Sequence, residues 1–260
     1  MQHGGFQLDP HGGVFAERLC TWRSFNSVNP LNKMQINADL SKRAVADSRM
    51  LPWVPSPLAG VHRRMLERDG GEVARATSIV RYAANSSFTA HSHAKGEEFL
   101  VLKGIFSDES GDFTQGMYVR NPPSSKHTPS SAAGCVILVK LRQMQPEDTE
   151  FVRIDTQQDS SWTNSLNGEM TLQLYCGHGE KVHMLRWSTG MEFPDQSFDG
   201  GAEYFVIQGC FRDEDGTYGA GAWLRLPPGS RQSIQVQKES VVFRKTGHLR
   251  SVYMSVHPAG

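Results

Sequence analysis

Short runs of alternating apolar and polar residues, separated by turn-forming residues, recur along the chain from Met34 onward. Such runs are typical of β-strands, because alternate side chains of a strand point to opposite faces. Clusters such as Asp69-Gly70-Gly71 and Pro122-Pro123 between the runs favour turns. We therefore expect an all-β protein. The strands predicted in its first half are 35–37, 44–46, 61–66, 77–82, 98–106, 117–120 and 136–141.

The second half of the sequence repeats the first at a constant offset of 105 residues. A gapless series of matches predicts two copies of one fold. The expected domains are an N-terminal arm at 1–33, a first domain at 34–150 and a second at 151–260. The clearest matches are Arg81 with Arg186, Glu98 with Glu203, Gly104 with Gly209, Phe106 with Phe211, Gly116 with Gly221, Arg120 with Arg225 and Pro122-Pro123 with Pro227-Pro228.

Composition narrows the function classes. The 260 residues carry 27 basic and 27 acidic side chains, which gives no electrostatic case for a nucleic-acid partner or an acidic membrane. No apolar run approaches the ~20 residues of a membrane span, and the start lacks the basic and apolar regions of a secretory signal. We expect a cytoplasmic protein. Its four widely spaced cysteines are then expected to be free thiols.

A group of potential metal ligands stands out in the first copy. His91, His93 and Glu97 have equal parity and could share one face of a strand, and His127 would arrive from a second strand after a proline-rich turn. Neutral imidazole and carboxylate together suit zinc, iron(II), manganese and nickel, and spacing does not choose among them. The sequence therefore predicts one divalent metal ion, which is this chain's expected cofactor.

The second copy lacks these ligands. At the offset of 105, the four positions carry Gln196, Phe198, Ala202 and Gln232. Phenylalanine and alanine offer a metal no lone pair, and glutamine amides are weak ligands. We expect the second domain to be free of metal. Glu98, Arg120 and Asp108 are kept in both copies, and we expect them to form ion pairs that brace each domain, with Glu98 facing away from the metal. A role for Glu98 in supporting the metal ligands stays open.

The ligand pattern resembles two cupin motifs. His91, His93, Glu97 and Gly104 match the first motif, while Gly116, Pro122 and His127 match the second. Asn85 and Ser124 stand where these motifs have glycine, which concerns turn geometry and not the ligands. The stretches Gly96–Glu109 and Tyr118–Pro123 resemble more specifically the cupin domain of the ChrR-type zinc anti-sigma factors, and this similarity runs from about Asn32 to about Leu141.

The resemblance implies two tandem cupin barrels, each a jelly roll or double-stranded β-helix, with zinc favoured in the first. ChrR-type anti-sigma factors also carry a separate N-terminal zinc-binding helical domain that grips the sigma factor. Residues 1–33 do not resemble it, so sigma-factor binding is not expected. Tandem barrels resemble the dimer of single-domain cupins, and further assembly into a homodimer stays open.

Three functions fit these features. The first is a binding or sensory protein that holds a small molecule at the metal centre. The second is an enzyme, a metal-dependent dioxygenase of iron or manganese that cleaves a small diketone or aromatic substrate; no catalytic residue beyond the metal ligands is apparent. The third is a purely structural metal. The second copy argues against a purely structural metal, because that copy must fold without an ion.

Overall fold

The computed structural model describes residues 34–165 and 167–249, and nearly all regular structure in these ranges is β-strand. The all-β prediction is confirmed. The helical segment that these residues contain is one 3-10 turn, η1 (Asp159–Ser161), and no helix among them is long and apolar enough to cross a bilayer. Cys135, Cys176 and Cys210 are free thiols, as predicted. The predicted arm and Cys20 lie outside the described residues.

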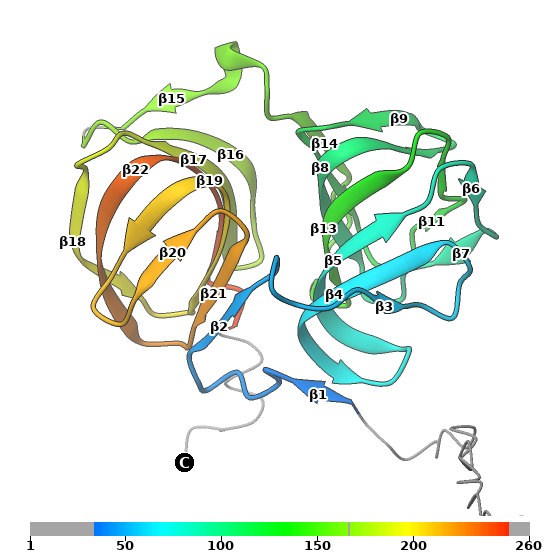
Figure 1. The fold of residues 1–260 in the computed structure, drawn as a ribbon, viewed down its shortest axis with the longest axis horizontal. Helices are drawn as coiled ribbons and strands as arrows, with labels where there is room; N and C mark the ends of the chain where they lie inside the picture. Colours follow the sequence, from blue (N-terminus) through cyan, green and yellow to red (C-terminus); the bar gives the residue numbers. More distant parts are fainter. Residues whose placement is uncertain (1–33, 166, 250–260) are drawn as a thin grey trace, which may run out of the picture. The chain divides into compact units, whose positions relative to one another are not determined.

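The first half forms one barrel, at the right of Figure 1. Its main sheet runs in the order β1-β4-β5-β13-β8-β10, while β7 and β11 form a separate two-stranded ladder. All seven predicted strands are present. The strands of this half are β1 (Gln35–Ile36), β2 (Ala44–Asp47), β3 (Val54–Pro55), β4 (Val61–Gly70), β5 (Ala74–Tyr82), β6 (Ser86–Ser87), β7 (His91–Ser92), β8 (Glu97–Asp108), β9 (Gly111–Thr114), β10 (Met117–Asn121), β11 (Lys126–His127), β12 (Ser130–Ser131) and β13 (Cys135–Leu141).

The second half forms the other barrel, at the left of Figure 1. Its sheet runs in the order β15-β16-β17-β22-β19-β21. One long strand, β22, spans the positions that β11, β12 and β13 occupy in the first half. The strands of this half are β14 (Val152–Asp155), β15 (Thr163–Asn164), β16 (Met170–Gly177), β17 (Glu180–Trp187), β18 (Glu192–Phe198), β19 (Ala202–Arg212), β20 (Thr217–Gly219), β21 (Ala222–Leu226) and β22 (Ser230–Thr246).

Two strands are exchanged between the barrels. Strand β2, from the first half, pairs antiparallel with β21 of the second barrel, and Figure 1 shows the two side by side. Strand β14, from the second half, pairs antiparallel with β10 of the first barrel. The registers are equivalent, since Asp47 lies opposite Ala222 and Asp155 opposite Met117. Strand pairing therefore crosses the predicted domain boundary at residue 150 in both directions.

The central strands of both barrels are buried on two faces. Along β8, Phe99 and Val101 belong to the core inside the first barrel, whereas Leu100 packs in a second core with Phe205 and Phe243 of the other half. This follows from the alternation of side chains along a strand. It explains why the central strands read as nearly continuous apolar runs.

Glu98 lies on the face of β8 that contacts the second barrel, so the prediction that it faces away from the metal ligands is confirmed. Its carboxylate is 3.2 Å from Arg120 Nη1 and 2.5 Å from Lys245 Nζ of β22. The repeat supplies the mirror contact, in which Lys140 Nζ lies 2.6 Å from the Glu203 carboxylate. Each barrel thus gives a buried lysine to a buried glutamate of the other.

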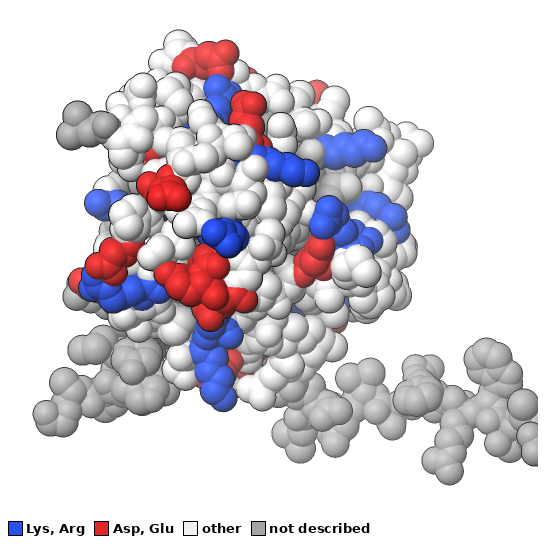
Figure 2. All heavy atoms as spheres, turned by 60° about the vertical axis from the view of Figure 1, so that its left-hand side comes forward, with Lys and Arg blue, Asp and Glu red and all other residues white. Residues whose placement is uncertain are grey.

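Charged side chains of both signs are mixed on the molecular surface. Figure 2 shows acidic and basic groups interspersed over one face, and neither sign dominates it. This distribution agrees with the equal numbers of basic and acidic residues in the chain.

Candidate metal centre

Three imidazole rings and one carboxylate converge in the first barrel. The ligand atoms of His91, His93 and His127 lie within 4.8 Å of one another. His93 Nε2 is 3.0 Å from His127 Nε2, and Glu97 Oε2 is 3.5 Å from the first and 3.6 Å from the second. Ligand atoms about 2.0–2.1 Å from one tetrahedral ion lie roughly 3.3 Å apart. His93, His127 and Glu97 have about this spacing, and His91 lies near enough to the other two histidines to complete a group that could hold a metal ion.

The strands and a turn place these residues. His91 in β7 lies directly opposite His127 in β11, and Figure 1 shows the two strands together. Strand β7 ends at Ser92, and a turn that includes Gly96, at φ 72°, leads into β8 at Glu97. The expectation that one strand carries His91, His93 and Glu97 on one face is wrong, because this turn separates them. The turn, rather than strand parity, aims Glu97 at the histidines.

Backbone turns with positive φ hold the ligands in place. Ser124 has φ 69° and Asn85 has φ 57°, and these are the two positions at which the cupin motifs have glycine. Glycine adopts this region without strain, and other residues do so less easily. The Ser124 N–H donates to the carbonyl of His93 at 2.8 Å. The left-handed turn is thus kept without its glycine, and it anchors the backbone of a metal-ligand candidate.

Hydrogen bonds orient the ligand rings. His127 Nδ1 lies 3.2 Å from Asp108 Oδ2, and His91 Nδ1 lies 3.1 Å from the carbonyl of Thr89. Each Nδ1–H can donate to these acceptors, which leaves Nε2 as the free lone pair. The Asn121 amide donates to Glu97 Oε2 at 3.3 Å. These contacts are of the kind that fix ligands around a metal.

Burial shapes the charge of the centre. Burial lowers the pKa of His93 to about 4, and the nearby His91 lowers it further. Burial also lowers the pKa of His127, although the negative charge of Glu97 acts in the opposite direction. Burial also raises the pKa of the Glu97 carboxyl, although His127 and Asn121 oppose the shift. The imidazoles of His93 and His127 are therefore uncharged near neutral pH, which is the form that binds a metal.

Asp108 does not take part in the ion pairs expected from the sequence. Glu98 and Arg120 form the predicted ion pair, but Asp108 contacts His127 instead. The reason is a bulge near Gly104, which shifts the alternation of β8 so that Phe106 and Asp108 face the barrel interior. The sequence shows only that both copies keep an aspartate here; in the second barrel Asp213 accepts a hydrogen bond from Gln232, the counterpart of His127.

Comparison with models of protein families identifies the family of this chain. The model of the ChrR cupin-like domain matches the chain twice, at residues 41–145 and 150–250. The chain belongs to the ChrR cupin-like domain family. Both copies of the repeat are therefore ChrR cupin-like domains, and the tandem cupin fold predicted from the sequence is confirmed. No curated protein matches the sequence.

Solved structures show the same fold at low sequence identity. A candidate dioxygenase from Nostoc punctiforme is 14% identical with a TM-score of 0.63, covering 81% of this chain and 84% of that one. The protein YlbA from Escherichia coli is 15% identical with a TM-score of 0.62, covering 84% and 96%. The bacterial pirin YhhW from Escherichia coli, solved with nickel(II), is 10% identical with a TM-score of 0.60, covering 79% and 98%. These likenesses establish the cupin fold alone.

The second ChrR cupin-like domain places the replaced residues at equivalent points. Gln196 in β18 lies opposite Gln232 in β22, as His91 lies opposite His127. Gln232 Nε2 donates to Asp213 at 2.7 Å, as His127 bonds Asp108. The offset of 105 residues therefore describes the structure as well as the sequence.

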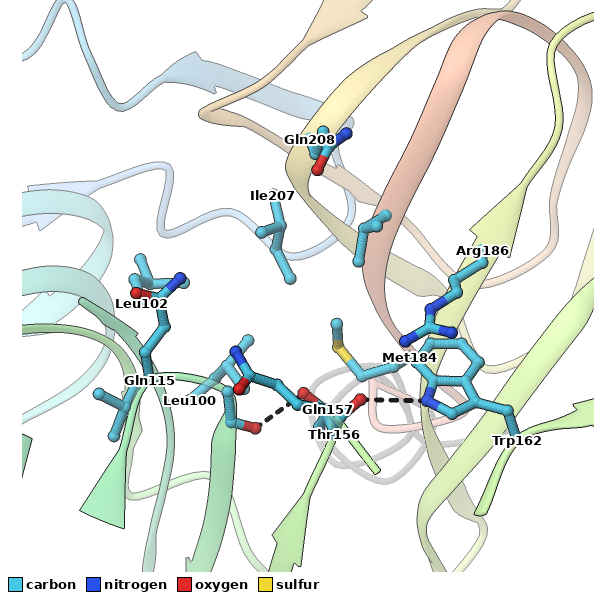
Figure 3. A pocket seen from close by; sticks show the side chains of 13 residues that line it. Leu100, Leu102, Gln115, Thr156, Gln157, Trp162, Met184, Arg186, Ile207 and Gln208 are labelled. Carbon is cyan, nitrogen blue, oxygen red and sulfur yellow. Dashed lines mark hydrogen bonds between the residues drawn. The ribbon is translucent and has the colours of Figure 1, made fainter. Parts of the chain in front are cut away.

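A separate cavity of about 170 Å³ lies between the two cupin domains, and Figure 3 shows the side chains around it. Leu102 and Ile207, which are equivalent residues of the two copies, both line it. At its edge Arg186 stacks on Trp162 at 4.0 Å, as Arg81 stacks on Trp53 at 4.6 Å in the first copy. This cavity belongs to the interface and contains none of the four candidate ligands.

Proposed function

We propose that this protein binds one divalent metal ion through His91, His93, Glu97 and His127, and that the centre binds or senses a small molecule. The observation that carries the proposal is the convergence of His93, His127 and Glu97, whose ligand atoms lie 3.0–3.6 Å apart, with His91 within 4.8 Å of the other two imidazoles. The ring nitrogens that point outward are occupied by Asp108 and the carbonyl of Thr89. A donor set with such support is suited to a metal.

The donor chemistry restricts which metal the centre can take. Three neutral imidazoles with one carboxylate suit zinc, iron(II), manganese and nickel better than calcium or magnesium, which prefer oxygen ligands. Zinc is our first expectation because the family takes its name from zinc anti-sigma factors. When bound, the ion would act as a Lewis acid toward a small ligand.

Access to the centre favours a functional ion over a structural one. His91 is exposed, whereas Glu97 and His127 are buried, so one side of the centre faces solvent. The second domain folds around Phe198 and Ala202 at equivalent positions, both of which pack in its core. The barrel therefore does not need ligands to close.

The walls of the centre are aromatic. The ring of Phe106 lies 5.9 Å from that of His127, and it contacts Tyr82 at 5.6 Å between ring centroids. Tyr82 also contacts Phe88 at 5.3 Å. Burial, with Glu97 nearby, raises the pKa of Tyr82, so this phenol stays protonated. Phe106 is 2% exposed, so these aromatic residues close the inner side of the centre to water.

The aromatic walls and the solvent-exposed edge also support a second candidate function, a metal-dependent dioxygenase for a small diketone or aromatic compound. An iron or manganese ion in the centre would supply the chemistry that activates dioxygen. The chain's own residues would keep His127 oriented through Asp108, and a substrate would reach the ion from the exposed side at His91. The Nostoc punctiforme neighbour, a candidate dioxygenase, shares the fold.

One experiment separates the two functions. Metal content is measured on protein purified without added metal, and oxygen uptake is then measured after anaerobic iron(II) loading with a panel of diketones and catechols. Stoichiometric zinc without uptake supports binding or sensing. Substrate-dependent uptake that is lost in His93→Ala supports a dioxygenase. Protein that takes up no divalent metal at all contradicts both.

A further inference from the structure

A cavity lies in the second barrel beside the counterparts of two metal ligands of the first barrel. Its volume is about 340 Å³, and Gln196 and Phe198, the counterparts of His91 and His93, line it. Arg244, Thr246 and the exposed Lys181 also line it. The second domain therefore has an open site next to the place where the ligands were lost.

Cationic side chains replace apolar ones in this cavity. Arg244 of β22 corresponds to Val139 of β13, which is buried inside the first barrel, and Lys181 of β17 corresponds to Ala76. Register supports the comparison, since Arg244 lies opposite Tyr204 as Val139 lies opposite Phe99. Arg244 thus projects into the interior of the second barrel, where Tyr204 is a core residue.

The charge of Arg244 is incompletely matched. Its Nη1 lies 3.9 Å from Glu169 Oε1, an oxygen that already accepts from the Trp187 indole at 2.6 Å. The Nε of Arg244 is buried without a hydrogen-bond partner. Burial, together with Arg244 and Lys181, lowers the pKa of His183 to about 4, so that imidazole stays neutral and adds no competing positive charge.

Asp199 at the rim is the acidic residue of the lining, and it is exposed and 3.4 Å from the Ser197 hydroxyl. The inner wall is therefore positive and apolar, while its acidic group faces solvent.

We propose that the second barrel binds a small organic carboxylate, with Arg244 and Lys181 holding the carboxylate and Phe198 contacting the apolar body. A guanidinium matches a carboxylate with two parallel hydrogen bonds, and cavities of this size suit small ligands with a few polar anchors. The two barrels would then bind ligands of opposite charge at neighbouring positions of the repeat, a cation in the first and an anion in the second.

Calorimetric titration of the full chain with benzoate tests this inference, and benzamide serves as the uncharged match. Benzoate is expected to bind, with benzamide at least about tenfold weaker. Arg244→Gln should weaken benzoate about tenfold or more, and Lys181→Gln about threefold. Arg231→Gln is the matched control, because Arg231 is an exposed arginine of the same strand that pairs with Asp195. The Arg231→Gln variant should leave the affinity for benzoate unchanged.

The outcomes that overturn the inference are distinct from failure of the metal centre. Benzoate binding that is lost in His93→Ala and kept in Arg244→Gln would place the carboxylate on the metal. Equal binding of benzamide, or tighter binding of inorganic phosphate than of benzoate, would exclude a carboxylate site. Absence of binding below about 10 mM for acetate, succinate and benzoate alike would also overturn it. If Arg244→Gln folds poorly, Lys181→Gln replaces it, because Lys181 is exposed; an unchanged affinity for benzoate in Lys181→Gln would then overturn the inference.

Discussion

The ammonium of Lys140 in the first barrel lies 2.6 Å from both carboxylate oxygens of Glu203 in the second. The repeat reproduces the contact in reverse, with Lys245 bound to Glu98. All four side chains are almost fully buried. Removing one partner of such a pair leaves an uncompensated charge in a low-dielectric interior, which costs more than the pair itself contributes.

We therefore expect Lys140→Met to destabilise the protein by about 3–5 kcal/mol, since it removes the ammonium that balances the buried Glu203 carboxylate and leaves that carboxylate with the Trp223 indole and His248. Lys103→Met, at an exposed position of β8, is the matched control and should change stability by less than about 0.5 kcal/mol. Urea denaturation measures both. The double variant Lys140→Met with Glu203→Leu should recover much of the loss, and failure to recover would refute the pairing.

The same carboxylates predict a loss of stability in acid. Burial alone would raise the pKa of Glu98, but Lys245, Arg120 and Lys140 outweigh it and lower the pKa from 4.5 to about 2. A carboxyl whose pKa is lower in the folded state stabilises the protein above its unfolded pKa. Stability should therefore fall as the pH drops from about 5 toward 2.

Denaturation midpoints measured across this pH range test the acid dependence. Glu98→Gln should be less stable at neutral pH and should lose less further stability in acid than the parent chain. Glu192→Gln, at an exposed position of β18, is the control and should follow the parent chain. An unchanged pH dependence in Glu98→Gln would show that another group causes the loss of stability in acid.

Asp108 should govern metal affinity through His127. Asp108→Asn leaves a side chain of the same size but removes the negative charge beside Nδ1, so we expect metal affinity to fall about 10–100-fold. Asp213→Asn changes the equivalent residue of the second barrel and should leave the metal affinity unchanged. Competition with a chromogenic chelator measures both. Equal affinity of Asp108→Asn and the parent chain would assign Asp108 a purely structural role.

Strand exchange should make the halves dependent on each other. A fragment of residues 151–260 lacks β2, and a fragment of 34–150 lacks β14, so each would expose the edge strand that the missing strand covers. We expect each fragment to aggregate or remain unfolded alone. Produced together, they should form a one-to-one complex, which size-exclusion chromatography can detect. A monomeric, folded fragment would contradict the exchange.

Sequence reasoning located the strands and the ligand group because both depend on local patterns. Alternation placed Glu98 on the face away from the metal ligands, and the turn residues marked the ends of the strands. The exchange of β2 and β14 was not predicted, because a short strand such as Ala44–Asp47 carries no signal for which sheet it joins. Asp108 was misplaced because parity fails across the bulge near Gly104, which no local pattern revealed.

The central claim is a single metal ion held by the first barrel, and elemental analysis of the purified full chain tests it most directly. We predict one divalent metal ion per chain, lost in His93→Ala and in His127→Ala. Gln232→Ala, at the counterpart of His127, should leave the metal content unchanged. Metal retained by both histidine variants, or lost with Gln232→Ala, would contradict the assignment of the centre to the first barrel.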